Sequence, residues 1–187
     1  MKKIILVAFV ILLGSNLKAQ ISAGLKLGTN FSSVQTSGGG VSISTSNRTA
    51  FNFGGYARIS LPSSLKLQPE FLYQGMGGTI NGTTFKNDYV TVPILLQYAV
   101  TKNFLLEAGP QIGLLVSSKV EGENIKDAFK SSDVQMLIGA SVGITGKIGL
   151  GVRYGMSLSN ISTDSYSTVK TDVKNKAFSI MVSYKLF

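Results

Sequence analysis

The stretch ISAGLKLGTNF, residues 21–31, alternates apolar and polar side chains along its whole length. One set of alternate positions is Ile21, Ala23, Leu25, Leu27, Thr29 and Phe31, and the other is Ser22, Gly24, Lys26, Gly28 and Asn30. Because successive side chains of a β-strand point to opposite faces, the pattern predicts a strand with one apolar and one polar face. Seven further stretches of this kind begin near residues 51, 65, 90, 104, 134, 148 and 178.

The connectors between these eight stretches are long and short in turn. Short turns are expected at 62–64, 101–103 and 146–147, and long loops at 34–48, 77–88, 118–133 and 159–175. Alternating strands joined in this rhythm are typical of outer-membrane barrels, which have short turns at one end and long loops at the other. The sequence therefore predicts an all-β fold, an eight-stranded antiparallel up-and-down transmembrane β-barrel.

The polar faces carry all the charges of the predicted strands and most of their glycines. The charged residues there are Lys26, Arg58, Lys66, Glu70, Glu107, Arg153 and Lys185, and the glycines are Gly24, Gly28, Gly54, Gly109, Gly113, Gly139, Gly143, Gly149, Gly151 and Gly155. Glycine is depleted from ordinary sheet faces but suits the crowded interior of an eight-stranded barrel. We therefore expect the polar faces to line the lumen and the apolar faces to contact lipid. The reverse arrangement, a soluble lipocalin-like carrier with an apolar interior, is an alternative.

Residues 1–19 have the features of a secretory signal peptide. Lys2 and Lys3 precede an apolar run of ten residues at 4–13, and Ala19 ends the segment. Such a run is too short for a transmembrane helix, which needs about 20 residues. The predicted organisation is a signal peptide at 1–19 and an outer-membrane β-barrel at 20–187, located in the outer membrane of a Gram-negative-type cell envelope.

The composition offers little catalytic chemistry. The chain has no histidine and no cysteine, so a Ser-His-Asp triad, a usual zinc site and a disulfide framework are all excluded. Its 18 basic and 9 acidic residues give a net charge of +9, but the charges are scattered, and we do not expect nucleic-acid binding. We expect no enzymatic activity, no cofactor and no metal site.

Two inward carboxylates, Glu70 and Glu107, could suggest a glycosidase pair. Their predicted strands are separated by another strand, and arginines share the interior. A charge removed from water needs a partner. We therefore predict an interior polar network that plugs the lumen, made of Lys26, Arg58, Lys66, Glu70, Glu107 and Arg153.

Three prolines, Pro69, Pro93 and Pro110, fall inside predicted strands. Proline cannot donate a hydrogen bond to the sheet, and a closed barrel has no edge strand to accommodate it. Local bulges are expected at these positions, and a broken strand is the alternative.

Several segments resemble a known family. LQPEFLYQG (67–75), YVTVPILLQY (89–98), EAGPQIGLLVS (107–117), LIGASVGI (137–144) and VRYGMSLSNI (152–161) are similar to the small outer-membrane β-barrel proteins often labelled "porin family". The resemblance covers nearly all of residues 20–187 and implies fold and location rather than an activity. It also implies that the terminal aromatic Phe187 is the signal read by the barrel-assembly machinery. Tyr184, three residues earlier, has the opposite strand parity.

For function, we expect a structural or surface-interaction role, with mobile extracellular loops and a monomeric barrel. Eight basic residues fall at the loop end: Arg48, Lys86, Lys119, Lys126, Lys130, Lys170, Lys174 and Lys176. They favour outer-membrane lipid, specifically the phosphates of lipopolysaccharide, as the partner. A narrow porin-like channel for ions or small solutes is the alternative.

Overall fold

The computed structural model describes residues 21–38, 41–80, 82–126, 130–158 and 172–187. Its strands are β1 (Ile21–Gly38), β2 (Val41–Ser44), β3 (Ser46–Ser60), β4 (Leu65–Ile80), β5 (Thr83–Ala99), β6 (Phe104–Val120), β7 (Glu123–Asn124), β8 (Ser132–Gly143), β9 (Ile148–Ser157) and β10 (Asp172–Lys185). None of the described residues belongs to a helix long and apolar enough to cross a membrane.

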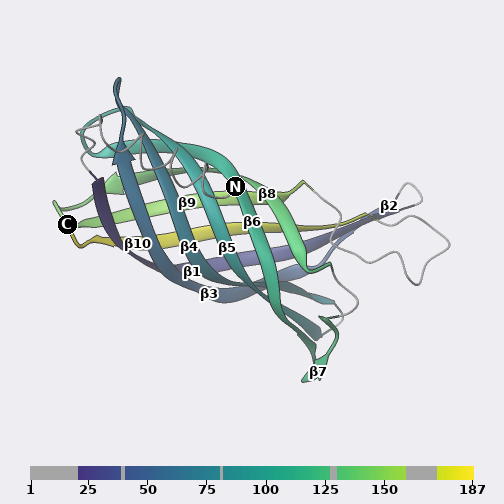
Figure 1. Ribbon diagram of the computed structural model, residues 1–187. Coiled ribbons are helices and arrows are strands. Elements are labelled where there is room, and N and C mark those ends of the chain that lie inside the picture. The colour runs from purple at the N-terminus through teal and green to yellow at the C-terminus, as the bar shows by residue number, and fades with distance from the viewer. Residues whose placement is uncertain (1–20, 39–40, 81, 127–129, 159–171) are drawn as a thin grey trace, which may run out of the picture.

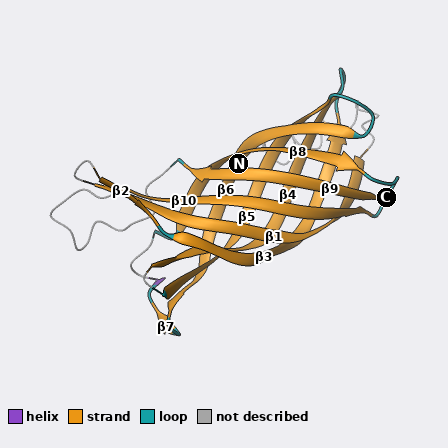
Figure 2. Cartoon of the chain, turned by 180° about the vertical axis from the view of Figure 1, so that it is seen from behind, coloured by secondary structure: helices purple, strands orange, loops and turns teal. Residues whose placement is uncertain are grey.

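Eight of these strands form a closed antiparallel barrel. The order around the cylinder is β1, β3, β4, β5, β6, β8, β9 and β10, and β10 pairs again with β1. The closing register places Leu25 opposite Tyr184 on one side and opposite Gly55 on the other. The strands run obliquely around the cylinder, while β2 and β7 project beyond one end of it (Figures 1 and 2). The predicted eight-stranded up-and-down barrel is confirmed.

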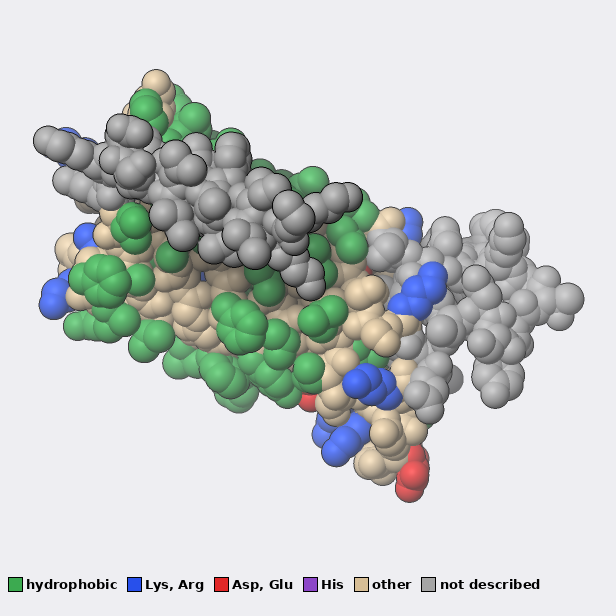
Figure 3. Space-filling model, in the orientation of Figure 1, with side chains coloured by type: hydrophobic (Ala, Val, Ile, Leu, Met, Phe, Trp, Pro, Cys, Tyr) green, Lys and Arg blue, Asp and Glu red, His purple; other side chains and the backbone are tan. Residues whose placement is uncertain are grey.

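The apolar side chains point outward and the polar ones inward. Leu25, Val152 and Ile180 are 55%, 40% and 40% exposed, whereas Gln68 and Gln97 are fully buried. Apolar side chains cover the middle of the cylinder in Figure 3, with Lys and Arg towards its two ends. The lipocalin-like alternative is therefore wrong, because such a carrier needs an apolar interior.

The hairpins at the loop end are longer than the sequence predicts. The predicted loop at 77–88 is wrong, since β4 and β5 stay paired to Ile80 and Thr83, with Thr79 opposite Thr84. The loop at 34–48 is wrong for the same reason, because β1 continues and pairs with β2. These segments are rich in Ser, Thr, Gly and Asn, so the ladder persists there without the regular alternation that marks the rest of each strand.

Two other predicted loops are only partly described. The loop at 118–133 contains the short β7, which pairs with the end of β6. Of the loop at 159–175, the residues 159–171 lie outside the described ranges, and β10 begins at Asp172. The predicted signal peptide, residues 1–19, also lies outside them.

The expected bulges at the prolines are wrong, and so is the alternative of a broken strand. Pairing between β4 and β5 is interrupted after Pro69, and pairing between β5 and β6 after Pro93, but both ladders resume in the same register. Pro110 keeps its place opposite Met136. The register shifts of the sheet lie elsewhere, between Asn47 and Asn52 and beside Asp88. The absent N–H of Pro69 and Pro93 therefore interrupts the pairing of neighbouring strands locally, but neither strand gains the extra residue that defines a bulge.

The outward face can be tested by placing a charge on it. Val152→Arg should lower the free energy of unfolding by about 2–4 kcal/mol in lipid vesicles, because the guanidinium would lie in the hydrocarbon. Urea titration of the refolded barrel measures this change. Leu186→Arg, just past the end of β10, is the control and should cost about 0–1 kcal/mol near the interface. An equal, small effect of both substitutions would contradict the assignment of this face to lipid.

Candidate functional site: the charged interior

Strand parity brings four charged side chains together in the middle of the barrel. Lys26 comes from β1, Glu70 from β4, Glu107 from β6 and Arg153 from β9. All four are buried, with exposed fractions of 8%, 3%, 6% and 2%. We call these residues the charge quartet.

Arg153 holds both carboxylates of the charge quartet. Its Nη1 donates to Glu70 Oε2 at 2.9 Å and its Nη2 to Glu70 Oε1 at 3.0 Å. Its Nε and Nη2 donate to Glu107 Oε1 at 2.9 and 2.8 Å. A guanidinium suits this position because its fixed fork of donors matches carboxylate geometry, which an ammonium cannot do.

Other side chains donate further hydrogen bonds to the carboxylates of Glu70 and Glu107. Lys26 Nζ and Gln68 Nε2 each donate to Glu70 Oε1 at 2.6 Å. Gln97 Nε2 donates to Glu107 Oε2 at 2.8 Å. Two cations thus face two anions with neutral amides around them, so the charge quartet has no net charge. Buried charges are tolerated under these conditions, when they are both paired and hydrogen-bonded.

The other two predicted network residues lie outside the charge quartet. Arg58 Nε donates to Gln68 Oε1 at 2.7 Å, and its guanidinium lies 5.3 Å from the centre of the Tyr56 ring. Arg58 is thus linked to the charge quartet through the Gln68 amide and through the Tyr56 ring, which Lys26 also approaches at 5.6 Å. Lys66 has no hydrogen bond or ion pair with any described residue, and it faces a cavity at the turn end.

A second buried polar layer surrounds Asp133, nearer the loop end. Gln135 Nε2, Ser157 Oγ and Asn175 Nδ2 donate to Asp133 Oδ2 at 2.7, 2.9 and 3.0 Å. Asp133 is 1% exposed and forms no ion pair within the described ranges. Three neutral donors therefore bind one oxygen of its carboxylate in place of a cation, while Oδ1 has no hydrogen-bond partner among the described residues.

Sequence reasoning missed Asp133 as an interior residue because it was assigned to the loop at 118–133. The pattern that could have placed it is parity, since it lies two residues before Gln135 and four before Leu137, both inward. β8 in fact begins at Ser132, one residue before Asp133.

Two of these contacts join strands on opposite sides of the cylinder. β4 and β9 are four places apart in an order of eight strands, and so are β5 and β10. The Arg153 to Glu70 pair spans the first two strands at 2.9 Å. Asn175 Nδ2 donates to Tyr89 Oη across the second two at 3.3 Å. Side chains therefore meet across the full width of the barrel at two levels.

Glycine leaves the room that these side chains occupy. A Cβ at Gly139 would lie 3.2 Å from Glu107 Oε1 and 2.6 Å from the carbonyl oxygen of Val152. A Cβ at Gly28 would lie 2.7 Å from Asn52 Oδ1. The inward glycines thus permit the close approach of neighbouring strands and polar side chains in a narrow interior.

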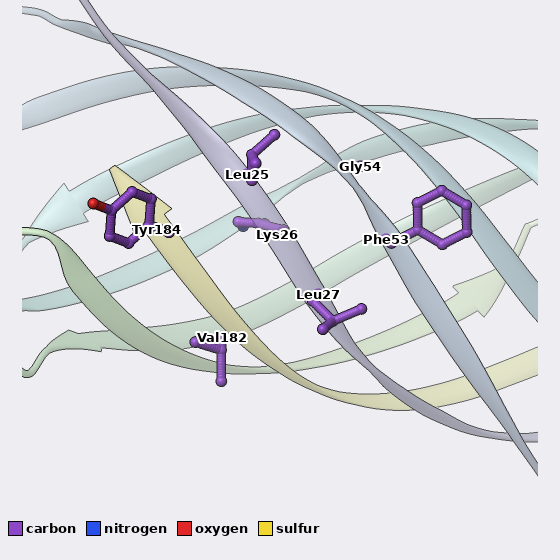
Figure 4. A pocket seen from close by; sticks show the side chains of 7 residues that line it. All are labelled: Leu25, Lys26, Leu27, Phe53, Gly54, Val182 and Tyr184. Carbon is purple, nitrogen blue, oxygen red and sulfur yellow. The ribbon is translucent and has the colours of Figure 1, made fainter. Parts of the chain in front are cut away.

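The outer wall carries a shallow apolar depression of about 400 Å³ beside β1. It is lined by Leu25, Leu27, Phe53, Val182 and Tyr184, whose side chains are shown with Lys26 and Gly54 in Figure 4. The neighbouring outward position, opposite Leu25, is a glycine without a side chain. The side chains that line the depression are mostly apolar, and it lies on the face assigned to lipid.

Phe187 is 69% exposed and lies beyond the end of β10 at Lys185. The Ala23 N–H still donates to the Phe187 carbonyl oxygen at 3.3 Å, so the C-terminus stays attached to β1. Its role in assembly stays a prediction.

The closed barrel, apolar outside and polar inside, defines an outer-membrane β-barrel protein. The family model described as "Outer membrane protein beta-barrel domain" matches residues 15–163. The chain belongs to this family, and its location is the outer membrane of a Gram-negative-type cell envelope.

Two solved structures illustrate the similarity of fold. Neisserial surface protein A is 15% identical with a TM-score of 0.53, and the match covers 87% of this chain and 97% of that one. Ail of Yersinia pestis is 12% identical with a TM-score of 0.51, covering 88% and 98%. At these identities the likeness concerns the fold alone. No curated protein matches the sequence.

Removing the guanidinium of the charge quartet should be costly. We expect Arg153→Met to lower the free energy of unfolding by about 3–5 kcal/mol, because two buried carboxylates lose their main partner. Denaturant titration in detergent measures the loss. Arg58→Met is the matched control; it breaks one bond to a neutral amide and should cost about 1 kcal/mol.

The combined variant Arg153→Met, Glu107→Gln should recover part of that stability, since the charges that remain buried, Lys26 and Glu70, form an ion pair with each other. If the combined variant is less stable than Arg153→Met alone, the charge balance is not the source of the effect.

Proposed function

We propose that this protein is a plugged outer-membrane barrel with a structural and surface-binding role, and that it is neither a catalyst nor an open channel. The observation that carries the proposal is the Arg153 to Glu70 ion pair between strands on opposite sides of the cylinder. An eight-stranded barrel has an interior that side chains can fill, and here charged groups in mutual contact fill it.

The porin-like alternative requires a continuous passage. Such a passage would have to cross the charge quartet and then the layer around Asp133, where Asn175 reaches Tyr89. Moving these side chains aside would separate buried charges from their partners, which costs several kcal/mol. The geometry therefore favours a closed lumen.

Conductance tests the closed lumen. We expect the native barrel in a planar lipid bilayer to give no current above that of the protein-free bilayer, because no water-wide path crosses the charge quartet. The combined variant Arg153→Ser, Glu70→Ser, Glu107→Ser should give stable current steps once its folding is verified by circular dichroism. Stable steps from the native protein would reject the plug.

The surface role rests on outward lysines at the loop end. Lys86 of β5 lies directly opposite Lys119 of β6, and both are exposed. Like charges directly opposite on one sheet face repel each other, and neither lysine has an ion pair among the described residues. A phosphate between them would remove the repulsion.

A second outward lysine, Lys176, lies next to an apolar surface. Lys176 lines a depression of about 470 Å³ together with Phe31, Phe178 and Tyr154, and with the polar Ser33. The register places Phe31 opposite Phe178. Ser33 lies opposite Lys176, two residues further along β1 toward the loop end. Acyl chains could contact the aromatic rings while a headgroup phosphate meets the ammonium.

Lipopolysaccharide is the partner that we propose for these lysines, because it carries phosphates next to acyl chains. Ail, similar in fold, has been solved with the heparin analogue sucrose octasulfate, which is also a polyanion. We further propose that the barrel is monomeric, since each of its eight barrel strands is paired on both sides, and that Phe187 is read during assembly.

The lysine pair gives a direct test. The double variant Lys86→Gln, Lys119→Gln should weaken lipopolysaccharide binding about tenfold at low ionic strength, because two charge-assisted contacts are lost. Binding of labelled lipopolysaccharide to the barrel in nanodiscs measures this. The control Lys102→Gln, Lys147→Gln removes the same charge at the turn end and should bind as the native protein does. Equal weakening by both pairs would mean that only net charge matters.

A further inference from the structure

A cavity of about 270 Å³ opens at the turn end of the barrel, below the charge quartet. Five of the residues that line it are cationic: Arg58, Lys66, Lys102, Lys147 and Lys185. No aspartate or glutamate is among its lining residues. This concentration of one charge sign differs from the charge quartet, where cations and anions balance.

The cations reach the cavity from two directions. Arg58, Lys66 and Lys185 lie on β3, β4 and β10 at inward positions, so the barrel wall separates them from the lipid side. Lys102 and Lys147 lie in the turns after β5 and β8 and stand at the rim. A ligand that contacts all five has to enter through the turn end, along the barrel axis.

The charge of these side chains is not compensated by the protein. Glu70 and Glu107, the nearest carboxylates along the inward face, are already held by Arg153 and Lys26. None of the five cavity cations takes part in an ion pair in the described part of the chain. Like charges gathered around one cavity repel one another, and a bound anion would turn that repulsion into attraction.

Neutral donors complete the lining. Ser141 contributes a hydroxyl group and Asn103 an amide group, while the Ser183 hydroxyl already donates to the Gly149 carbonyl oxygen. Arg58 uses its Nε on Gln68, which leaves its two terminal nitrogens without a hydrogen bond to a described residue. Ammonium groups, one guanidinium and hydroxyls together suit an anion with several oxygens and more than one charge.

We propose that the turn-end cavity binds a soluble, multiply charged anion of the phosphate class, such as phosphate or pyrophosphate. Lipid headgroups carry the same chemistry, but the outer side of the wall around Arg58, Lys66 and Lys185 is apolar, and a headgroup would have to leave the membrane surface to reach them. This site goes beyond the surface role and is separate from the outward lysines of the loop end.

Calorimetric titration tests the proposal, with sodium pyrophosphate as the probe and the full mature barrel refolded in non-ionic detergent at low ionic strength. The native protein should show saturable binding at a stoichiometry of about one. The double variant Lys66→Gln, Lys185→Gln should weaken that binding at least about tenfold, because it removes two inward cations. The control Lys86→Gln, Lys119→Gln removes equal charge from the loop end and should change the affinity less than about twofold.

Two results would overturn the site itself. One is the absence of saturable pyrophosphate binding to the native barrel. The other is an equal loss in the two double variants, which would mean that the anion responds to net charge alone. Since neither variant touches the charge quartet, circular dichroism should report the same folded barrel for both, and a variant that fails to fold is replaced by Lys66→Met, Lys185→Met.

A second experiment, in lipid, distinguishes a soluble phosphate from the phosphate of a lipid headgroup. In nanodiscs of phosphatidylcholine and of phosphatidylglycerol, a soluble anion should bind with similar affinity at moderate salt, because headgroups do not enter the cavity. Loss of pyrophosphate binding only in phosphatidylglycerol would show that headgroups occupy the cavity, and it would overturn the assignment to a soluble anion.

Discussion

Backbone hydrogen bonding in a medium without water is the constraint on which this structure depends. In hydrocarbon, each unpaired N–H or C=O group costs several kcal/mol, so a sheet can cross the membrane only if its first and last strands pair. The β1 to β10 ladder, which runs from Gly24 opposite Lys185 to Ser37 opposite Asp172, provides that closure. Closure in turn fixes the parity of every strand, because one face must then meet lipid and the other the lumen.

The narrow lumen follows from the strand number and explains the chemistry inside it. Side chains from opposite strands come into contact, so a charge placed on the inward face meets other protein groups instead of bulk water. Arg153 resolves this by binding two carboxylates at once, and Asp133 resolves it with three neutral donors. Gly139 leaves space beside Glu107 in the first arrangement, and Gly155 leaves space beside Gln135 in the second.

The sequence predicted the part of the fold that spans the membrane, where contact with lipid excludes charged side chains from the outer face. Alternation identified eight strands and the inward positions of Lys26, Glu70, Glu107 and Arg153, because any charge on the other face would be penalised. It did not predict the extent of β4, β5 or β8 toward the loop end, where water surrounds the hairpins and the alternation is less regular. For that reason the sequence analysis did not identify Asp133 as an inward residue of a strand. The bulges expected at Pro69 and Pro93 are absent because two strands can lack a hydrogen bond at a proline and still keep the same register on both sides of it.

The two ends of the barrel present their cations on opposite faces, and this difference has consequences for what each end can bind. At the loop end, Lys86, Lys119 and Lys176 point outward, at the level where a lipid headgroup can approach from the side. At the turn end, Arg58, Lys66 and Lys185 line a cavity inside the barrel wall. The charge quartet lies between these two sets of cations and carries no net charge. The barrel therefore separates two groups of positive charge, one that faces outward and one that faces the lumen, and the ligands proposed for the two groups differ because of that separation.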